Sequence, residues 1–189
     1  SAVMTDVVPS KSLIATAEAA GAIGEASELG VQFFSRHGDR RAVRPEVEVN
    51  LATVNRRLLG LARQQSEDMR SALIRAGVRI VAGEGRLDGT RGLIVSTGGE
   101  HGTDFDAIEA DTIMVSVGAS PRELPTAEPD GERILTWKQL YDLPEIPAHL
   151  IVVGSGVTGA EFASAYTALG AKVTLISSRE QVLPGEDAD

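Results

Sequence analysis

Two stretches in the first half of the chain carry apolar residues at helical spacing. From Pro9 to about Ala26, small and apolar residues recur as they do in a helix, and Pro9 stands at the mouth of the stretch. From about Leu51 to Ala76 the apolar residues form one broad stripe, and Gly77 follows it, so we expect a long amphipathic helix that stops there. The residues of this stripe are Leu51, Val54, Leu58, Leu61, Ala62, Met69, Leu73 and Ile74.

After Gly77 the pattern changes to short strands separated by Gly and Asp. The segments VRIVAGEGRL, GLIVSTG and FDAIEADTIMVSVG predict a strand meander. We expect the apolar part TIMVSV to return to a parallel sheet, so that the meander is an insertion into that sheet. The Gly-, Asp- and Arg-containing residues 30–45 predict a loop, and the proline-rich residues 121–149, with a short TWKQLYDL helix, predict a linker.

A strand, a glycine loop, a helix and a second strand follow this linker. The apolar run from Leu150 to Val153 predicts the first strand, the helix extends to Leu169, and Lys172 to Ile176 form the second strand. A GxGxxG pattern between a strand and a helix is typical of a dinucleotide-binding βαβ unit. A glycine-rich turn that binds no ligand is the alternative.

The three glycines of the loop have separate predicted roles in binding NAD(P). Gly154 permits the tight turn, Gly156 lets backbone N–H groups approach a pyrophosphate, and Gly159 lets the helix pack closely on the strand. Val157 and Thr158 complete the loop at the helix N-terminus, where the partial positive charge favours phosphates.

The residues after the second strand bear on the choice between NADH and NADPH. An NAD site usually has a carboxylate there that accepts hydrogen bonds from the ribose, but this chain has Ser177, Ser178 and Arg179. Two hydroxyl donors and a guanidinium suit a 2′-phosphate, so we expect NADPH to be accepted at least as well as NADH. Because Glu180 follows, a solvated loop is the alternative.

Composition and charge exclude several classes of function. The net charge of −9, from 27 acidic and 18 basic residues, argues against nucleic acid or an anionic membrane as partner. The basic run RHGDRRAVR, from Arg36 to Arg44, lacks aromatic residues and is expected to be a solvated loop. No apolar stretch approaches a membrane span and no signal sequence is visible, so we expect a cytoplasmic protein. With no cysteine and three scattered histidines (His37, His101, His149), we expect no metal site.

The order of these motifs resembles the flavoprotein disulfide reductases, such as lipoamide dehydrogenase, glutathione reductase and mercuric reductase. The PSK helix, long helix, strand meander, VSVGASPRELP, linker and VVGSGVTGAEFA match the family from Ser1 to Asp189. Within the family, TDVVPSKSLIATAE, PDGERILTW and LIVVGSGVTGAEF are most similar to the actinobacterial NAD(P)H quinone reductases that are homologous with lipoamide dehydrogenase.

The resemblance implies an α/β, FAD/NAD(P)-binding Rossmann-like fold, a doubly wound parallel sheet with a β-meander insertion, in two partial domains. Residues 1–148 would be a partial FAD-binding domain without its first βαβ unit, with the linker from about 121, and residues 149–189 the first βαβ unit of the NAD(P)-binding domain. The chain would then be a segment of a longer, homodimeric enzyme or a degraded relative. We expect the segment alone to be inactive and marginally stable.

The resemblance also assigns residues to the flavin. The family's lysine beside flavin N5 and its glutamate partner correspond to Lys11 and Glu161. An ammonium there would stabilise negative charge on the reduced flavin, and the carboxylate would offset the cost of burying it. Val157 stands where several relatives have an aromatic gate, which implies a more open nicotinamide pocket. The other residues implied at the FAD are Pro9, Ser10, Gly83, Gly85, Val117, Gly118 and Ala119.

One departure from the family changes the expected chemistry. The redox-active cysteine pair of the family falls at Ala2 and Val7, so dithiol–disulfide exchange by the family's route is chemically impossible here. Hydride transfer from NAD(P)H to FAD and on to a quinone-like acceptor remains the expected activity. The alternatives are a dihydrolipoamide dehydrogenase-like protein and a non-catalytic, vestigial nucleotide-binding fragment.

Overall fold

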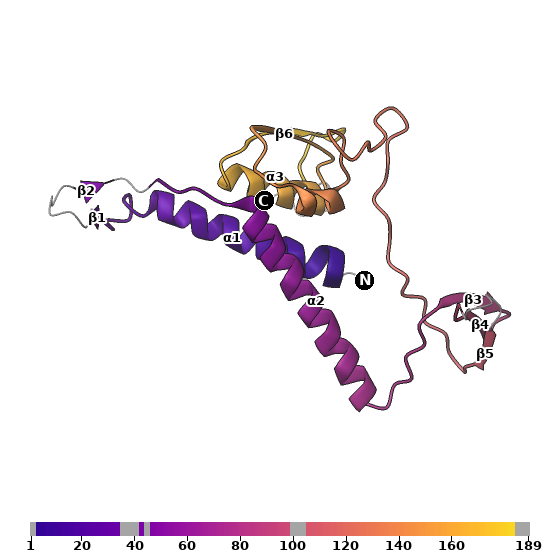
Figure 1. The fold of residues 1–189 in the computed structure, drawn as a ribbon. Helices are drawn as coiled ribbons and strands as arrows, with labels where there is room; N and C mark the ends of the chain where they lie inside the picture. Colours follow the sequence, from indigo (N-terminus) through magenta and orange to yellow (C-terminus); the bar gives the residue numbers. More distant parts are fainter. Residues whose placement is uncertain (1–2, 35–41, 44–45, 99–104, 184–189) are drawn as a thin grey trace. The chain divides into compact units, whose positions relative to one another are not determined.

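The computed structural model describes residues 3–34, 42–43, 46–98 and 105–183. These residues form two compact units. Unit 1 comprises Ser1–Gln65 and Ser120–Asp189, and unit 2 comprises Ser66–Ala119. Figure 1 shows the helices and strands of both units, which are described separately below.

Helix α1 (Val8–Glu25) begins at the Pro-Ser-Lys turn, as predicted, and follows the short π-helix η1 (Val3–Val7). Pro9 is suited to the first turn because its missing N–H would have no partner inside the helix there. One face of α1, with Leu13 and Ala17, is buried.

Helix α2 (Leu51–Arg75) also matches its prediction. At its start, the Asn50 side chain accepts a hydrogen bond from the Thr53 N–H at 2.8 Å, which satisfies one of the unpaired donors of the first turn. At its end, Gly77 has a φ of +82°, and the next residue, Val78, donates its N–H to the Leu73 carbonyl at 3.0 Å. This left-handed turn explains why the helix stops at glycine.

The buried residues of the predicted apolar stripe of α2 all lie in its first half, where Leu61 is nevertheless 39% exposed. Leu51, Leu58 and Ala62 lie in the core, whereas Leu73 and Ile74 near the helix end are 45% and 50% exposed. Amphipathic spacing indicates which face of a helix is apolar, but not which element covers it. Although α2 is long, neither it nor any other helix within the described ranges is apolar enough to cross a membrane.

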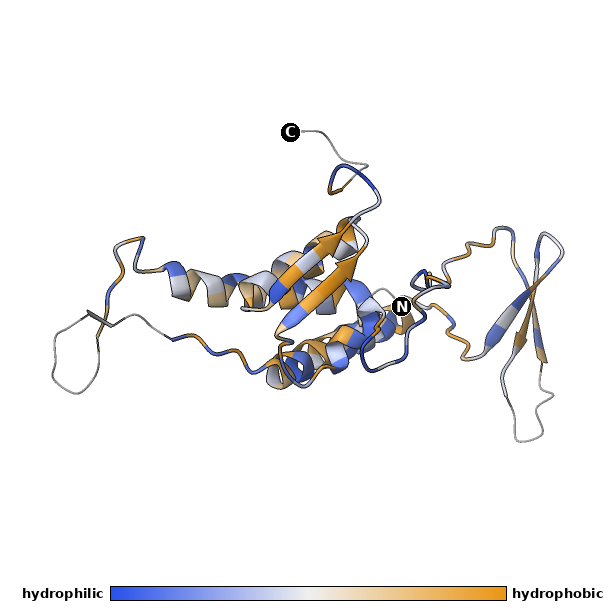
Figure 2. Ribbon diagram, turned by 90° about the horizontal axis from the view of Figure 1, so that it is seen from above, coloured by the Kyte–Doolittle hydropathy of each residue, from blue (hydrophilic) through white to orange (hydrophobic). Residues whose placement is uncertain are grey.

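The predicted βαβ unit lies in unit 1. Strands β6 (His149–Val153) and β7 (Lys172–Ile176) pair in parallel, and helix α3 (Val157–Ala168) connects them. Figure 2 shows that both strands are largely hydrophobic. Alternate residues are half-buried, while Ile151, Val153 and Ile176 are between 48% and 62% exposed.

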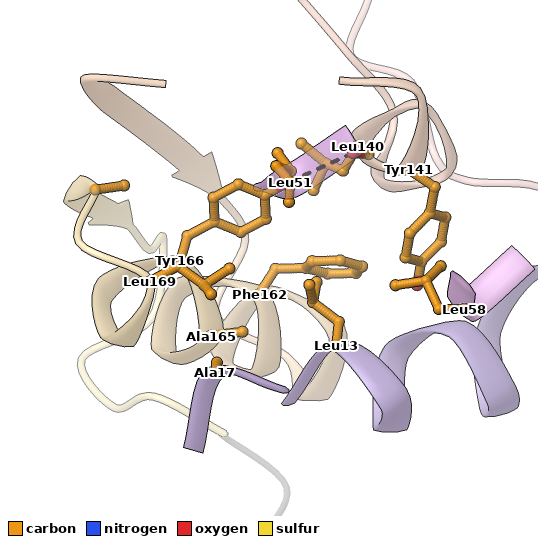
Figure 3. Packing of buried hydrophobic residues seen from close by; sticks show 11 residues of the cluster. Leu13, Ala17, Leu51, Leu58, Leu140, Tyr141, Phe162, Ala165, Tyr166 and Leu169 are labelled. Carbon is orange, nitrogen blue, oxygen red and sulfur yellow. Dashed lines mark hydrogen bonds between the residues drawn. The ribbon is translucent and has the colours of Figure 1, made fainter. Parts of the chain in front are cut away.

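One hydrophobic core joins the helices of unit 1 (Figure 3). It lies where α1 packs on α3, and it includes residues of α2 and of the 3-10 helix η2 (Trp137–Asp142), the predicted TWKQLYDL helix. The Tyr141 and Phe162 rings meet at a centroid distance of 5.8 Å and an angle of 56°, a favourable tilted arrangement. The cluster contains Leu13, Ala17, Leu51, Leu58, Leu140, Tyr141, Phe162, Ala165, Tyr166, Leu169 and Ala171.

Two polar side chains inside this core donate hydrogen bonds to carbonyl groups at the C-terminal end of η2, one in its last turn and one just after it. Asn55 of α2 donates to the Leu143 carbonyl at 2.9 Å, and the Tyr166 hydroxyl of α3 donates to the Leu140 carbonyl at 3.4 Å. Burial raises the pKa of Tyr166 to about 12. The tyrosine is therefore a neutral donor at physiological pH, and both bonds hold η2 against the long helices.

Unit 2 contains the predicted meander. Strands β3 (Glu84–Asp88), β4 (Gly92–Ser96) and β5 (Phe105–Glu109) form an antiparallel sheet with β4 in the middle. Leu87, Leu93 and Ile108 pair across the sheet and therefore share one face. An ion pair from Arg79 to Asp106, at 2.6 Å, supports the outer strand β5.

Two segments predicted as strands do not form them. The VRIVAG part of the first segment and the TIMVSV stretch have no ladder partner within the described residues, and Val115 and Val117 are 64% and 89% exposed. A strand needs a neighbouring backbone for its hydrogen bonds, which an apolar pattern alone does not supply. Residues 30–45, predicted to form a loop, contain a short antiparallel pair of β1 (Phe33–Phe34) and β2 (Ala42–Val43).

A tight turn precedes η2, and it depends on one carboxylate. Asp130 accepts hydrogen bonds at 2.8 Å from the backbone N–H groups of Glu132, Arg133 and Ile134. These three donors hold the pKa of Asp130 below its ordinary value of 3.8, because they favour the charged form.

We expect Asp130→Asn to lower the melting temperature at pH 7, because the amide oxygen is a weaker acceptor than the carboxylate. A carboxyl group whose pKa is lower in the folded state stabilises the fold above its ordinary pKa and loses this contribution as pH falls through the folded-state value. The difference in melting temperature between wild type and variant should therefore shrink below about pH 4. Calorimetric scans from pH 7 to pH 3, with the exposed Glu128→Gln as control, measure it; a difference that is constant with pH would contradict the assignment.

Candidate functional site

The ion pair of Lys11 and Glu161 joins α1 to α3 across 150 residues of sequence. Lys11 lies in the first turn of α1, and Glu161 follows the glycine loop by about one turn of α3. The Lys11 side chain is 60% exposed and that of Glu161 is 24% exposed. The structure thus brings together the two residues that were predicted as catalytic, and it leaves the ammonium accessible.

Buried hydroxyl groups lie near this pair. Ser10, next to Lys11, is 2% exposed, and its Oγ has no hydrogen-bond partner among the described residues; the Tyr141 hydroxyl is also buried without one. Burial raises the pKa of Tyr141 most, and electrostatic interactions with Asp6, Tyr166 and Glu161 raise it further. The sequence patterns did not single out Tyr141, which is one of two aromatic residues in the short TWKQLYDL helix.

The glycine loop has the backbone geometry that its pattern predicts. Gly154 has a φ of +116°, and its N–H donates to the Ile176 carbonyl of β7 at 2.9 Å. A Cβ at Gly159 would lie 1.9 Å from the Gly154 carbonyl oxygen, so the start of α3 approaches the end of β6 as closely as only glycine allows. A Cβ at Gly156 would meet nothing within 4 Å, so the loop is open on this side.

The N-terminus of α3 fits an anionic ligand. Its first intrahelical bond in this region runs from the Ala160 N–H to the Gly156 carbonyl at 2.9 Å, so the N–H groups of Val157, Thr158 and Gly159 precede the hydrogen-bonded turns. Unpaired N–H groups, the helix dipole and the open side of Gly156 together suit a pyrophosphate. The residues that hold an NAD(P) pyrophosphate in the prediction are thus brought together.

The residues predicted to select the coenzyme lie beside the glycine loop. Ser177 Oγ lies 2.6 Å from Ser155 Oγ, which places the end of β7 directly next to the end of β6. Ser178 and Arg179 are exposed. No role was predicted for Ser155 from the sequence; serines at the ends of two neighbouring parallel strands were the missed signal.

The remaining predicted FAD residues belong to unit 2. A Cβ at Gly83 would lie 2.3 Å from the Ser96 carbonyl oxygen, so the meander itself requires glycine there. Gly85 lies beside the Leu93 side chain. The residues Val117, Gly118 and Ala119 are exposed, and Gly118 has a φ of +77°. Their contact with FAD stays a prediction.

Several other predictions fall outside the described residues. These are Ala2, His37, His101 and most of the basic run of residues 36–44. Val7, the second of the two family cysteine positions, is described and is 51% exposed. Within the described ranges no group of three or more His, Asp or Glu residues is placed to hold a metal ion, and His149 hydrogen-bonds to Thr174 at 2.9 Å.

An open surface depression of about 680 Å³ lies elsewhere in unit 1, between α1, α3 and β7. Its lining includes Gly21, Glu25 and Ser164, and none of the predicted site residues. The candidate site is therefore not this depression but the accessible edge formed by Lys11, Glu161 and the glycine loop.

Comparisons with known proteins agree with this geometry. The family model described as pyridine nucleotide-disulphide oxidoreductase matches residues 2–189. The chain is 47% identical over 193 residues to an NAD(P)H dehydrogenase (quinone) of Mycobacterium tuberculosis, and 33% identical over 182 residues to a dihydrolipoyl dehydrogenase of Chlorobaculum parvum. These alignments cover 100% and 96% of this chain but 37% and 36% of the relatives, so the chain spans little more than a third of their length.

A solved structure is similar over nearly the whole chain. The crystal structure of LpdA from Mycobacterium tuberculosis matches with a TM-score of 0.80 and 44% sequence identity, over 99% of this chain and 38% of that one. Together with the observed βαβ unit and meander, this match confirms the predicted α/β, FAD/NAD(P)-binding Rossmann-like fold class.

The glycines at positions 156 and 159 should respond differently to alanine. Gly159→Ala should destabilise the protein by about 1–3 kcal/mol, because the new methyl group collides with the Gly154 carbonyl. Gly156→Ala should change stability by less than about 0.5 kcal/mol, because the backbone is extended and the space is open. Chemical denaturation of both variants measures the difference; equal losses would show that the loop geometry is wrong.

Proposed function

The chain belongs to the pyridine nucleotide-disulphide oxidoreductase family, and from this premise we propose that it is part of an FAD-dependent NAD(P)H oxidoreductase with a quinone-like acceptor. The observation that carries the proposal is the accessible Lys11–Glu161 pair, which lies one helical turn from the glycine loop. The absence of thiols at positions 2 and 7 supports direct transfer to the acceptor.

The glycine loop and α3 would hold the NAD(P)H pyrophosphate. The N–H groups at the start of α3 are directed to one end of the helix, and the missing side chain of Gly156 leaves room for the phosphate oxygens. Glu161 is also on α3. A pyrophosphate bound at the N-terminus of α3 would therefore bring the nicotinamide end of NAD(P)H toward the Lys11–Glu161 ion pair.

Lys11 and Ser10 would face the flavin. The exposed Lys11 ammonium supplies a positive charge, which Glu161 holds in place from α3. The buried Ser10 hydroxyl has no partner among the described residues, and a polar edge of a bound flavin suits it. FAD, when bound, would supply the chemistry of accepting a hydride and passing on electrons.

The proposed electron acceptor is inferred from the side chains at the family's cysteine positions. Ala2 and Val7 have no atom that can attack a disulfide, so electrons have no protein thiol to pass through. A quinone accepts electrons directly, and the similar Mycobacterium tuberculosis protein is named a quinone dehydrogenase. We therefore propose a quinone-like acceptor rather than lipoamide. The family resemblance is also the basis for proposing a homodimeric, cytoplasmic complete enzyme.

The first test removes the charge of Lys11. Lys11→Met should slow flavin reduction by NADPH about 100-fold, because it removes the charge that stabilises electron density on the flavin. Stability should change by less than about 1 kcal/mol, since an exposed ion pair contributes little. Stopped-flow absorbance of the flavin-loaded enzyme measures the rate, and Lys172→Met on β7 is the matched control. An unchanged rate would refute the assignment of Lys11.

The second test addresses NADPH selectivity. Arg179→Glu should raise the Michaelis constant for NADPH about tenfold or more and that for NADH much less, because a charge-assisted contact to the 2′-phosphate is lost and a repulsion is added. Steady-state reduction of menadione with each coenzyme measures both constants, and Glu180→Gln is the control. Equal effects on the two coenzymes would rule out NADPH selection by Arg179.

A further inference from the structure

We propose that Ser155 is a positioning residue for coenzyme selectivity, which shapes the segment of residues 177–183 so that Arg179 can receive a 2′-phosphate. The inference rests on the proposed NAD(P)H function and adds to it a residue that touches neither the 2′-phosphate nor the flavin. Ser155, Ser177, Arg179 and Leu183 are joined by hydrogen bonds.

Ser155 is the middle residue of the glycine turn, and it is only 5% exposed. Its Oγ lies 2.6 Å from Ser177 Oγ, a short contact between two hydroxyl groups in a largely buried place. A spacer residue in a glycine turn would be expected to face solvent. The burial of Ser155 therefore indicates that its side chain holds something in place.

The direction of the proton in this contact follows from the other bonds of Ser177. Ser177 Oγ donates to the Arg179 carbonyl at 2.9 Å, and it accepts the Arg179 N–H at 2.9 Å. A hydroxyl has one proton, so Ser177, which gives its own to the Arg179 carbonyl, accepts from Ser155. The other acceptor within reach of Ser155 Oγ is the Gln181 carbonyl at 3.5 Å, a much longer contact than the 2.6 Å to Ser177. The Ser177 hydroxyl is then fully used within the protein, which leaves Ser178 and Arg179 as the groups available to a phosphate.

The backbone of Ser155 holds the far end of the same segment. Its carbonyl accepts the Leu183 N–H at 2.7 Å. Leu183 has a φ of +57°, a left-handed conformation that is costly for a bulky residue and that persists where surrounding contacts enforce it. Ser155 therefore holds both ends of the segment of residues 177–183: its side chain bonds Ser177, and its carbonyl bonds Leu183.

Arg179 is the residue on which this arrangement acts. Both its N–H and its carbonyl are held by Ser177, while its guanidinium makes no hydrogen bond or ion pair with the described part of the chain. The backbone of Arg179 is therefore positioned in advance, and its charged end is left for a ligand. Loss of the Ser155 donor would loosen this positioning without removing the guanidinium.

The test compares two probes that differ only in the 2′-phosphate. Adenosine 2′,5′-bisphosphate and 5′-AMP are titrated calorimetrically into the flavin-loaded enzyme. For Ser155→Ala we expect the dissociation constant of the bisphosphate to rise about tenfold and that of 5′-AMP to change by less than about twofold. Ser164→Ala, at an exposed serine of α3, is the matched control. Ser177→Ala is a second variant, for which we expect the same selective loss.

A double variant separates positioning from a general loss of structure. Since Ser155 acts through Arg179, Ser155→Ala combined with Arg179→Ala should lose no more of the bisphosphate preference than Arg179→Ala alone. Equal weakening of both probes in Ser155→Ala, or no change in either, would overturn the inference. If Arg179→Ala itself left the preference intact, the proposed NADPH selection would fail as well, which distinguishes the two failures.

Discussion

The packing of α1 on α3 is the interaction on which the rest of unit 1 depends. Leu13 and Ala17 on α1 share one buried cluster with Phe162 on α3, and the small Ala17 permits a close approach. This contact places the Pro-Ser-Lys turn beside the first turns of α3, so that Lys11 reaches Glu161. Because an exposed ion pair contributes little free energy, the apolar packing positions the pair, and not the reverse.

Helix α3 also connects this pair to the glycine loop. The absent side chain of Gly159 lets α3 start against the end of β6, and Glu161 follows within the next turn. An anion bound at the helix N-terminus is therefore held by the element that also holds the partner of Lys11. The Ser155–Ser177 contact extends this arrangement to the end of β7. Backbone and side-chain contacts thus join the Lys11–Glu161 pair, the glycine loop and the end of β7, the three parts of the proposed site.

Sequence patterns predicted the elements whose causes are local. The Gly77 stop of α2, the βαβ unit and the meander follow from glycine conformation and from hydrophobic spacing, and the Lys11–Glu161 contact followed from the family resemblance. TIMVSV was wrongly predicted as a strand, because pairing depends on a neighbouring backbone and not on its own apolar residues. Ser155 and Tyr141 were missed for a related reason: their burial comes from segments distant in sequence, which no local pattern reveals.

The central claim is that electrons leave the flavin directly, because the positions of the family's cysteine pair are Ala2 and Val7. An anaerobic titration of the flavin-loaded enzyme with NADPH, followed by flavin absorbance, tests this claim most directly. Because there is no redox disulfide that would also have to be reduced, one equivalent of NADPH should reduce the flavin completely. A requirement for two equivalents per flavin would reveal a second two-electron centre and contradict the account.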